Sequence, residues 1–202
     1  MYIPFDYILL ALVIAGINIV PAFMPPTWII LAFFYIQFHL LFIPTILIGA
    51  TCATLGRVVL ALLARRLGSK LIPKRMLRNY YSLGDFFEKH QRLTIPAVLM
   101  YAFFPISSNQ VYIIAGLSQI SLRIIAFSFL VGRLISYSFW VNLSYHLSHD
   151  FWALFVQHAT NFRSLFLDFL GLFIVVFVGI IDWQSILKMK NAKYFSRKTK
   201  RN

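Results

Sequence analysis

Four polar residues interrupt a long uncharged stretch of this sequence, close to a proline. The stretch covers the thirty residues 93–122, and its centre holds Pro105 and then Ser107, Ser108, Asn109 and Gln110. Hydroxyl and amide groups of these types donate and accept hydrogen bonds without carrying a charge. We expect them to hold a passing polar headgroup and to cap a half-helix that begins near Val111. The N-terminus of that half-helix would also offer partial positive charge to an anion.

Two arginines lie inside apolar segments, each directly after a glycine. Arg133 follows Arg123 by ten residues, or about 15 Å of helix, which predicts a position near the middle of a membrane. A charge at that depth costs at least about 2.5 kcal/mol, and a guanidinium is suited to forked contact with phosphate. We consider two roles for Arg133: contact with a lipid headgroup or coupling ion, and a structural bond to carbonyl groups of the break. Arg57, eight residues before Arg65, has the same options and can also snorkel to the interface.

The lengths of the uncharged stretches predict how these groups are positioned. One helix over residues 93–122 would be about 45 Å long, against about 30 Å for a hydrocarbon core. We therefore expect a break at Pro105 and two half-helices that reach the midplane and return. The fifty uncharged residues 7–56 are also too many for one span, and Pro25 and Pro26 supply the expected break. Because irregular backbone at this depth must be buried in protein or line a wet cavity, both breaks are predicted to line a pathway.

The predicted fold is an all-α polytopic membrane protein. Its expected segments are a hairpin over about 7–36, a span over 42–64, a basic segment over 65–92 with an amphipathic helix from Pro73, the broken segment 93–122, and spans over about 124–145 and 164–187. Gly84 weakens the amphipathic helix. Each half holds a proline-broken segment and then a span with a Gly-Arg pair. This order predicts an inverted repeat of two re-entrant helical hairpins, each followed by a transmembrane helix, with one more transmembrane helix at the C-terminus.

Composition and charge placement predict an integral membrane protein with a defined orientation. The chain is 60% hydrophobic and 12% charged, and of its 19 Lys and Arg eight lie within residues 65–92 and seven within 188–201. The positive-inside bias then makes the basic segment and a tail over 188–202 cytoplasmic, with residues 1–187 as one membrane domain in the cell membrane. The tail returns inside only if the segment 93–122 re-enters on the same side. We expect no nucleic-acid partner, because the basic clusters flank membrane spans and no nucleic-acid motif accompanies them.

No motif of soluble catalysis occurs in the chain. A nucleophile elbow, a phosphate-binding loop and a cysteine metal motif are all missing from the sequence, so we expect neither an enzyme nor a bound cofactor or metal. Gly116 lies in the second half of the broken segment, where a missing side chain lets backbones approach closely. We therefore add Gly116 to the candidate residues of the pathway.

Three stretches of the sequence resemble the DedA family of membrane proteins, whose shared region is also called the SNARE-associated or VTT domain. They are the proline-rich break 21–28, the run 42–68 with Phe-Ile-Pro-Thr, Thr-Leu-Gly-Arg and Arg-Arg-Leu-Gly, and the run 104–132 with Phe-Pro and Ala-Gly-Leu. They lie within a core of about 21–145. The resemblance implies two opposed re-entrant hairpins and lipid translocation, either of undecaprenyl phosphate in bacteria or as phospholipid scrambling in eukaryotes.

The sequence also departs from the family. Many bacterial members carry an acidic residue in the first hairpin, where this chain reads Ile-Ala-Gly-Ile-Asn over 14–18, and arginines about the second break, where it has Tyr101 and Ser108. These departures disfavour proton-coupled uptake and favour a passive, scramblase-like path.

The leading hypothesis is therefore a transporter that moves phospholipid or a phosphorylated lipid carrier between leaflets. Its partners would be membrane lipids with anionic or phosphate-bearing headgroups. One alternative is an ion-coupled exporter of small cations or drugs, which would show pH-dependent flux and sensitivity at Asp168 or Asp182. Another is a membrane scaffold that does not transport and that organises partners through its basic loop and tail.

Overall fold

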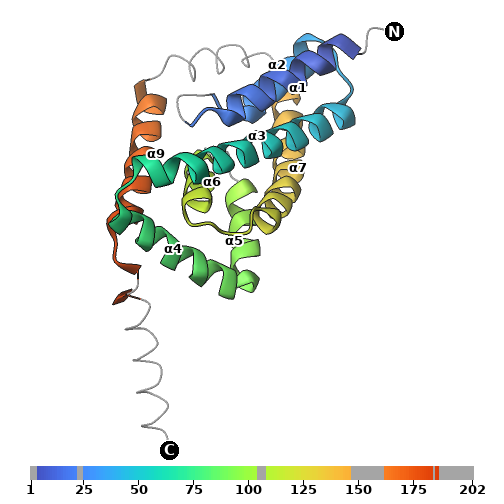
Figure 1. Cartoon of the computed structure of the whole chain (residues 1–202). Coiled ribbons are helices and arrows are strands. Elements are labelled where there is room, and N and C mark those ends of the chain that lie inside the picture. Colours follow the sequence, from blue (N-terminus) through green and yellow to red (C-terminus); the bar gives the residue numbers. More distant parts are fainter. Residues whose placement is uncertain (1–3, 22–24, 104–107, 147–161, 184, 187–202) are drawn as a thin grey trace, which may run out of the picture.

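The chain is helical throughout the part that the structure describes, as Figure 1 shows. This computed structural model describes residues 4–21, 25–103, 108–146, 162–183 and 185–186. Its helices are α1 (Pro4–Ile19), α2 (Thr27–Gln37), α3 (Phe42–Leu71), α4 (Lys74–Lys89), α5 (Gln91–Phe103), α6 (Asn109–Leu117), α7 (Leu122–His146) and α9 (Phe162–Ile180). The all-α prediction is confirmed for these residues.

Two of the described helices are long and apolar enough to cross a membrane. They are α3, over Phe42–Gly68, and α7, over Leu122–His146. Helix α3 continues to Leu71, past the predicted end at residue 64, and stops where Ile72 adopts an extended backbone with φ −109° and ψ 135°. Pro73 follows, and a proline excludes the helical conformation from the residue before it. Pro73, and not Arg65, therefore ends the helix.

The third predicted span corresponds to α9. This helix begins at Phe162 and ends at Ile180, so it is shorter at its C-terminal end than the predicted range of 164–187. Residues 184 and 187 lie outside the described part.

A break separates two short helices at each predicted position. Helix α1 ends at Ile19, and α2 begins at Thr27 directly after Pro26, whose φ of −55° suits the residue before a first helical turn. Helix α5 ends at Phe103, and α6 begins at Asn109, two residues earlier than predicted. Pro105 and Ser107 lie outside the described residues.

The turns that lead into the two long helices have the same backbone form. Residues 38–41 connect α2 to α3, and residues 118–121 connect α6 to α7. The second residue of each turn is left-handed, with φ 50° at His39 and φ 59° at Gln119. In the described residues these are the only non-glycine residues with positive φ, so the matching turns are an unusual feature that both halves share.

The two short helices of each half pack against different long helices. In the first half, α1 packs chiefly against α3 and α2 chiefly against α7. In the second half, α5 packs chiefly against α7 and α6 chiefly against α3, and α3 also contacts α7. Each long helix therefore packs against one short helix of its own half and one short helix of the other half (Figure 1).

Helix α4 is amphipathic, as predicted, and runs unbroken through Gly84. The buried side of α4 presents Leu77, Tyr80 and Leu83. A Cβ atom at Gly84 would lie 2.1 Å from the main-chain oxygen of Ser118 in the turn before α7. The glycine expected to weaken this helix is therefore the residue that lets α4 touch that turn.

Helix α9 is bound to α4 by side chains that reach its main chain. Asn79 Nδ2 donates to the oxygen of Gly179 at 2.8 Å, and the hydroxyl of Tyr80 donates to the oxygen of Val175. Burial raises the pKa of Tyr80 to about 12, so its phenol is protonated and able to donate at neutral pH. These bonds fix α4 and α9 relative to one another.

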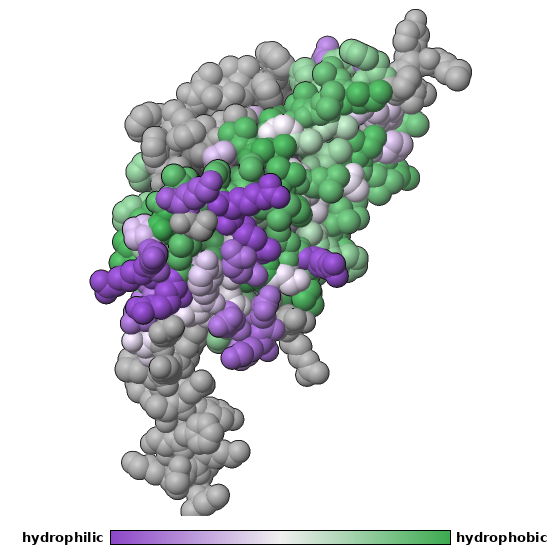
Figure 2. All heavy atoms as spheres, in the orientation of Figure 1, coloured by the Kyte–Doolittle hydropathy of each residue, from purple (hydrophilic) through white to green (hydrophobic). Residues whose placement is uncertain are grey.

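The outer surface is apolar over most of its extent. Large hydrophobic side chains are exposed on the outer sides of α1, α3, α7 and α9, among them Phe5 (72%), Ile43 (68%), Phe127 (69%) and Phe173 (64%). Among the coloured residues of Figure 2, hydrophobic ones cover the upper and middle part, and hydrophilic ones gather in the lower part, over α4 and the end of α3. Apolar exposure of this extent is typical of a surface that contacts a membrane or another protein.

Candidate functional site at the helix breaks

The Gly56–Arg57 pair joins α3 to the end of α1. A Cβ atom at Gly56 would lie 2.7 Å from the main-chain oxygen of Ala15 and 2.8 Å from the Cβ of Asn18. The two helices therefore touch along their backbones, which only glycine permits. Arg57 is 6% exposed, and its Nη1 donates to the main-chain oxygen of Asn18 at 3.3 Å. This oxygen lies in the last turn of α1, where carbonyl groups lack a partner within the helix.

The Gly132–Arg133 pair makes the corresponding contact in the second half. A Cβ atom at Gly132 would lie 2.6 Å from the Cβ of Ala102 and 3.1 Å from the oxygen of Leu99 in α5. Arg133 is 5% exposed, and its Nη2 donates to the hydroxyl of Ser108 at 3.4 Å. In each half, then, the glycine brings the long helix into contact with the first short helix of that half, and the arginine donates a hydrogen bond to a residue beside the break.

Aromatic rings surround the second arginine. The guanidinium carbon of Arg133 lies 4.9 Å from the ring centre of Phe129 and 5.4 Å from that of Tyr137. Tyr112 on α6 meets the Phe129 ring edge to face, with 5.1 Å between centres. Cation–π contacts of this kind stabilise a buried guanidinium without neutralising its charge.

The two arginines lie within electrostatic range of one another. Tyr101, Tyr112 and Tyr137 are also within range of Arg57, and no carboxylate is among the groups that act on it in the described part of the chain. The sequence explains this, since none of the six acidic residues falls in α2, α3, α5, α6 or α7. These five helices therefore bring positive charge and no carboxylate to the centre of the protein.

Several buried polar atoms beside the arginines make no hydrogen bond to any described residue. They include Arg57 Nε, Asn109 Oδ1, Ser136 Oγ, and the hydroxyls of Tyr112 and Tyr137. A buried polar atom without a partner costs about 1–3 kcal/mol, so a group of them is costly to maintain for packing alone. Together they offer donors and acceptors to a polar ligand.

Some of the predicted site residues are buried at the breaks, and others are half-buried or lie outside the described residues. Arg57, Arg133, Ser108 and Asn109 are all buried, and the first three make the contacts described above. Gln110 is half-buried in the first turn of α6, and Pro25 and Pro26 are half-buried before α2. Pro105 and Ser107 lie outside the described residues.

One detail of the predicted site is wrong. The side chain of Ser108 was expected to cap α6, but it makes no capping hydrogen bond, and its hydroxyl accepts from Arg133 instead. The close approach of backbones expected at Gly116 is present, since a Cβ atom there would lie 2.2 Å from the oxygen of Ala61. Gly116 therefore lets α6 pack on α3, and its place along a pathway stays a prediction.

The sequence prediction did not include Asn18, Tyr112 and Tyr137. Asn18 is 1% exposed, and its Nδ2 donates to Thr27 Oγ1 across the first break at 3.2 Å. An amide in the apolar stretch 7–20 was the available signal. Tyr137 follows Arg133 by four residues on α7, a spacing that places it beside that arginine. Tyr112 sits in an ordinary apolar helical pattern, and only the packing of α6 brings it to the arginines.

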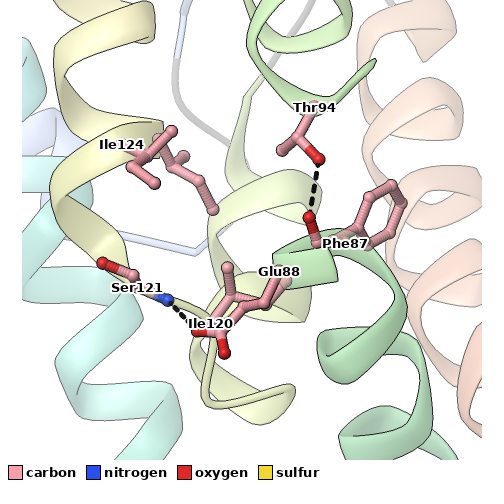
Figure 3. A pocket seen from close by; sticks show the side chains of 7 residues that line it. Phe87, Glu88, Thr94, Ile120, Ser121 and Ile124 are labelled. Carbon is pink, nitrogen blue, oxygen red and sulfur yellow. Dashed lines mark hydrogen bonds between the residues drawn. The ribbon is translucent and has the colours of Figure 1, made fainter. Parts of the chain in front are cut away.

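A small pocket lies apart from the arginines, between α4, α5 and the turn before α7 (Figure 3). In Figure 3 the side chain of Glu88 faces Ser121, whose amide nitrogen donates to Glu88 Oε1 at 3.0 Å. Thr94 Oγ1 donates to the main-chain oxygen of Phe87 at 3.1 Å. On the other side of the turn, Arg65 Nη2 donates to the oxygen of Ile120 at 2.7 Å. These bonds fasten the turn, so we assign the pocket to a structural joint.

Comparison of the chain with models of known protein families, with curated proteins and with solved structures found no match. The residues and their geometry are therefore the evidence for the function of the chain.

Proposed function

We propose that the chain is a membrane protein of the DedA type that moves phosphate-bearing lipids between leaflets. In this proposal α3 and α7 cross the membrane, and the α1–α2 and α5–α6 pairs are re-entrant hairpins that enter from opposite sides. The basic segment and the tail are cytoplasmic. The headgroup passes the breaks, where Arg57 and Arg133 bind its phosphate.

The lengths and the arrangement of the helices support the two hairpins. Helices α2, α5 and α6 have 11, 13 and 9 residues, or about 17, 20 and 14 Å, each well short of a hydrocarbon core of about 30 Å. An inverted repeat would produce two further features of this structure. Each long helix packs against a short helix of the other half, and the turns at His39 and Gln119 have the same backbone form.

The observation that carries the proposal is a pair of buried guanidiniums on helices without any acidic residue. A buried charge is costly unless an opposite charge accompanies it. Helices α2, α3, α5, α6 and α7 have no carboxylate to supply that charge, and Asp6 of α1 lies in the first turn of that helix, at the opposite end from Asn18. A phosphate group would supply it and would accept the forked hydrogen bonds that a guanidinium donates. The neighbouring tyrosine hydroxyls are further donors.

The same observation weighs against an exporter of small cations. Two positive charges at the centre repel a cation, and the acidic residues Asp168 and Asp182 lie on or after α9, which packs on α4 and α6. A scaffold without transport needs the arginines only as structural anchors of the breaks, which gives no role to the buried hydroxyls of Tyr112 and Tyr137 that make no hydrogen bond to a described residue. Neither alternative is favoured by a feature of its own.

Translocation in proteoliposomes tests the proposal. The purified chain should accelerate the movement of a fluorescent phospholipid between leaflets, measured by its chemical quenching on the outer leaflet. The double variant R57Q/R133Q should abolish the acceleration. R123Q, which removes an exposed charge at the start of α7, is the matched control and should keep it. A folded wild-type protein without acceleration, or a fully active double variant, would end the proposal.

A further inference from the structure

Exposed cations cover the corner where α3 passes into α4. They are Arg66 and Lys70 on α3 and Lys74, Arg75 and Arg78 on α4, and we name these five residues the basic corner. No acidic residue occurs in the chain between Asp6 and Asp85, so the sequence around the corner contains nothing to compensate its charge. Figure 2 shows hydrophilic residues gathered at this end of the molecule, beside a mainly hydrophobic surface.

An apolar stripe on α3 leads directly to the basic corner. Leu63, Leu67 and Leu71 are 40%, 48% and 75% exposed, and their spacing of four residues places them on one side of the helix. Arg66 and Lys70 each follow a leucine of this stripe by three residues, which keeps them on neighbouring positions of the same side. Leucines followed by cations along one face match the passage from acyl chains to headgroups at a membrane surface.

The rest of the structure holds the α4 cations in a fixed orientation. Leu77, Tyr80 and Leu83 are buried, and Lys74 and Arg78 therefore lie on the opposite, exposed side of the helix. The bonds from Asn79 and Tyr80 to α9 prevent rotation of α4. The cations are thus presented without a cost of ordering the helix, which strengthens binding.

We propose that the basic corner binds the anionic headgroups of the adjacent leaflet and so holds the first half of α4 on the membrane surface. The charge favours an anion, and the leucine stripe favours a lipid over an acidic protein segment or a nucleic acid. The second half of α4 presents Asp85, Glu88 and Lys89 and has no excess of cations, which confines the site to the corner. This site differs from the buried arginines and requires no translocation.

Retention of lipid by the purified full-length chain tests this proposal. The protein is immobilised in detergent micelles that contain equal amounts of phosphatidylglycerol and phosphatidylcholine, and the retained lipids are quantified by mass spectrometry. Each cation near an anionic surface contributes about a fivefold gain in affinity. We expect the wild type to retain several-fold more phosphatidylglycerol, and K74Q/R75Q/R78Q to bring the ratio of the two lipids close to one.

Two controls separate binding at the basic corner from an effect of total charge. R197Q/K198Q/R201Q removes two arginines and one lysine from the tail and should keep the preference. Raising the salt concentration should weaken the wild-type preference, because exposed charges are screened, and this arm needs no variant. Equal retention of both lipids by the wild type, a salt-independent preference, or an equal loss in the tail variant would overturn the proposal.

Discussion

The two buried arginines occupy matching positions in the two halves, but their surroundings differ. Arg57 donates to a main-chain oxygen, that of Asn18, which is fixed by the helix it ends. Arg133 donates over 3.4 Å to a hydroxyl that can rotate, and its guanidinium lies over two aromatic rings. A rotating hydroxyl and a ring face release a guanidinium more readily than a fixed carbonyl does. We infer that Arg57 chiefly anchors the first break and that Arg133 chiefly exchanges partners with a phosphate.

The largest expected effect is on translocation by the arginine variants. R133Q should slow phospholipid movement at least about tenfold, since a hydrogen bond to a charged group contributes about 1.5–3 kcal/mol. R57Q should slow it less and should lower the melting temperature more. The initial rate of translocation and the thermal unfolding of each variant in detergent measure the two effects.

The reverse order of these effects would break the comparison. If R57Q stopped translocation while leaving the melting temperature unchanged, the anchoring role would belong to Arg133 instead. R123Q serves again as the control for the loss of one positive charge.

The second prediction concerns the glycines that precede the arginines. Gly56→Ala should destabilise the protein by about 1–3 kcal/mol because the added methyl group meets the main chain of α1 and no side chain can move aside. Gly132→Ala should cost a similar amount, since the added methyl group would lie 2.6 Å from the Cβ of Ala102, which is fixed to its own backbone. Thermal unfolding measures both.

Gly16 provides the matched control within α1. It is exposed, and a Cβ atom there would meet nothing within 4 Å. Gly16→Ala should therefore stabilise the protein by roughly 0.5–1 kcal/mol through helix propensity alone. If all three alanine variants unfolded at the same temperature, the close approach of the helices would be refuted.

The third prediction compares the partners of the arginines. Ser108→Ala removes the hydroxyl that accepts from Arg133, and it should cost about 0.5–1.5 kcal/mol of stability and change the translocation rate. Asn18→Ala leaves the acceptor of Arg57 in place, because that acceptor is the main-chain oxygen. Its effect should come from the lost side-chain bonds to Thr27 and to the main-chain oxygen of Ile14, and it should appear as a lower melting temperature. A change in translocation for N18A without loss of stability would contradict this.

The smallest effects are expected at the turns before the long helices. Leu41 N donates to Tyr7 Oη at 3.0 Å, and Ser121 N donates to Glu88 Oε1 at the same distance. A carboxylate makes the stronger bond, so E88A should destabilise more than Y7F, with both below about 1 kcal/mol because the sites are exposed. Parallel melting curves measure the difference, and a larger effect of Y7F would count against equivalent turns.

The lengths of the uncharged stretches and the prolines were enough to predict the helices and the positions of both breaks. The extent of α3 was underestimated because a charge was taken as its end, although cations are tolerated in the last turns of a helix and Pro73 is the first residue that stops it. The membrane topology stays a prediction.

The site was predicted in part, and the missing part depends on tertiary packing. Arg57, Arg133, Ser108 and Asn109 were marked by polarity in an apolar context. The role of Gly116 and the approach of Tyr112 to the arginines follow from α6 packing on α3 and from the contact of α3 with α7. Tyr137 lies one helical turn after Arg133, and that spacing was a signal that the prediction did not use. No local pattern in α6 or α7 indicates which distant helix each will meet.

The central claim is that the buried arginines bind the phosphate of a moving lipid, and headgroup selectivity tests it most directly. Proteoliposomes are loaded either with a fluorescent phospholipid or with a fluorescent glucosylceramide, which is polar but lacks phosphate. We predict that the wild type accelerates the phospholipid at least about tenfold more than the glucosylceramide, in line with a charge-assisted contact, and that R133Q removes this preference. Equal acceleration of both lipids, or a preference that persists in R133Q, would contradict the claim.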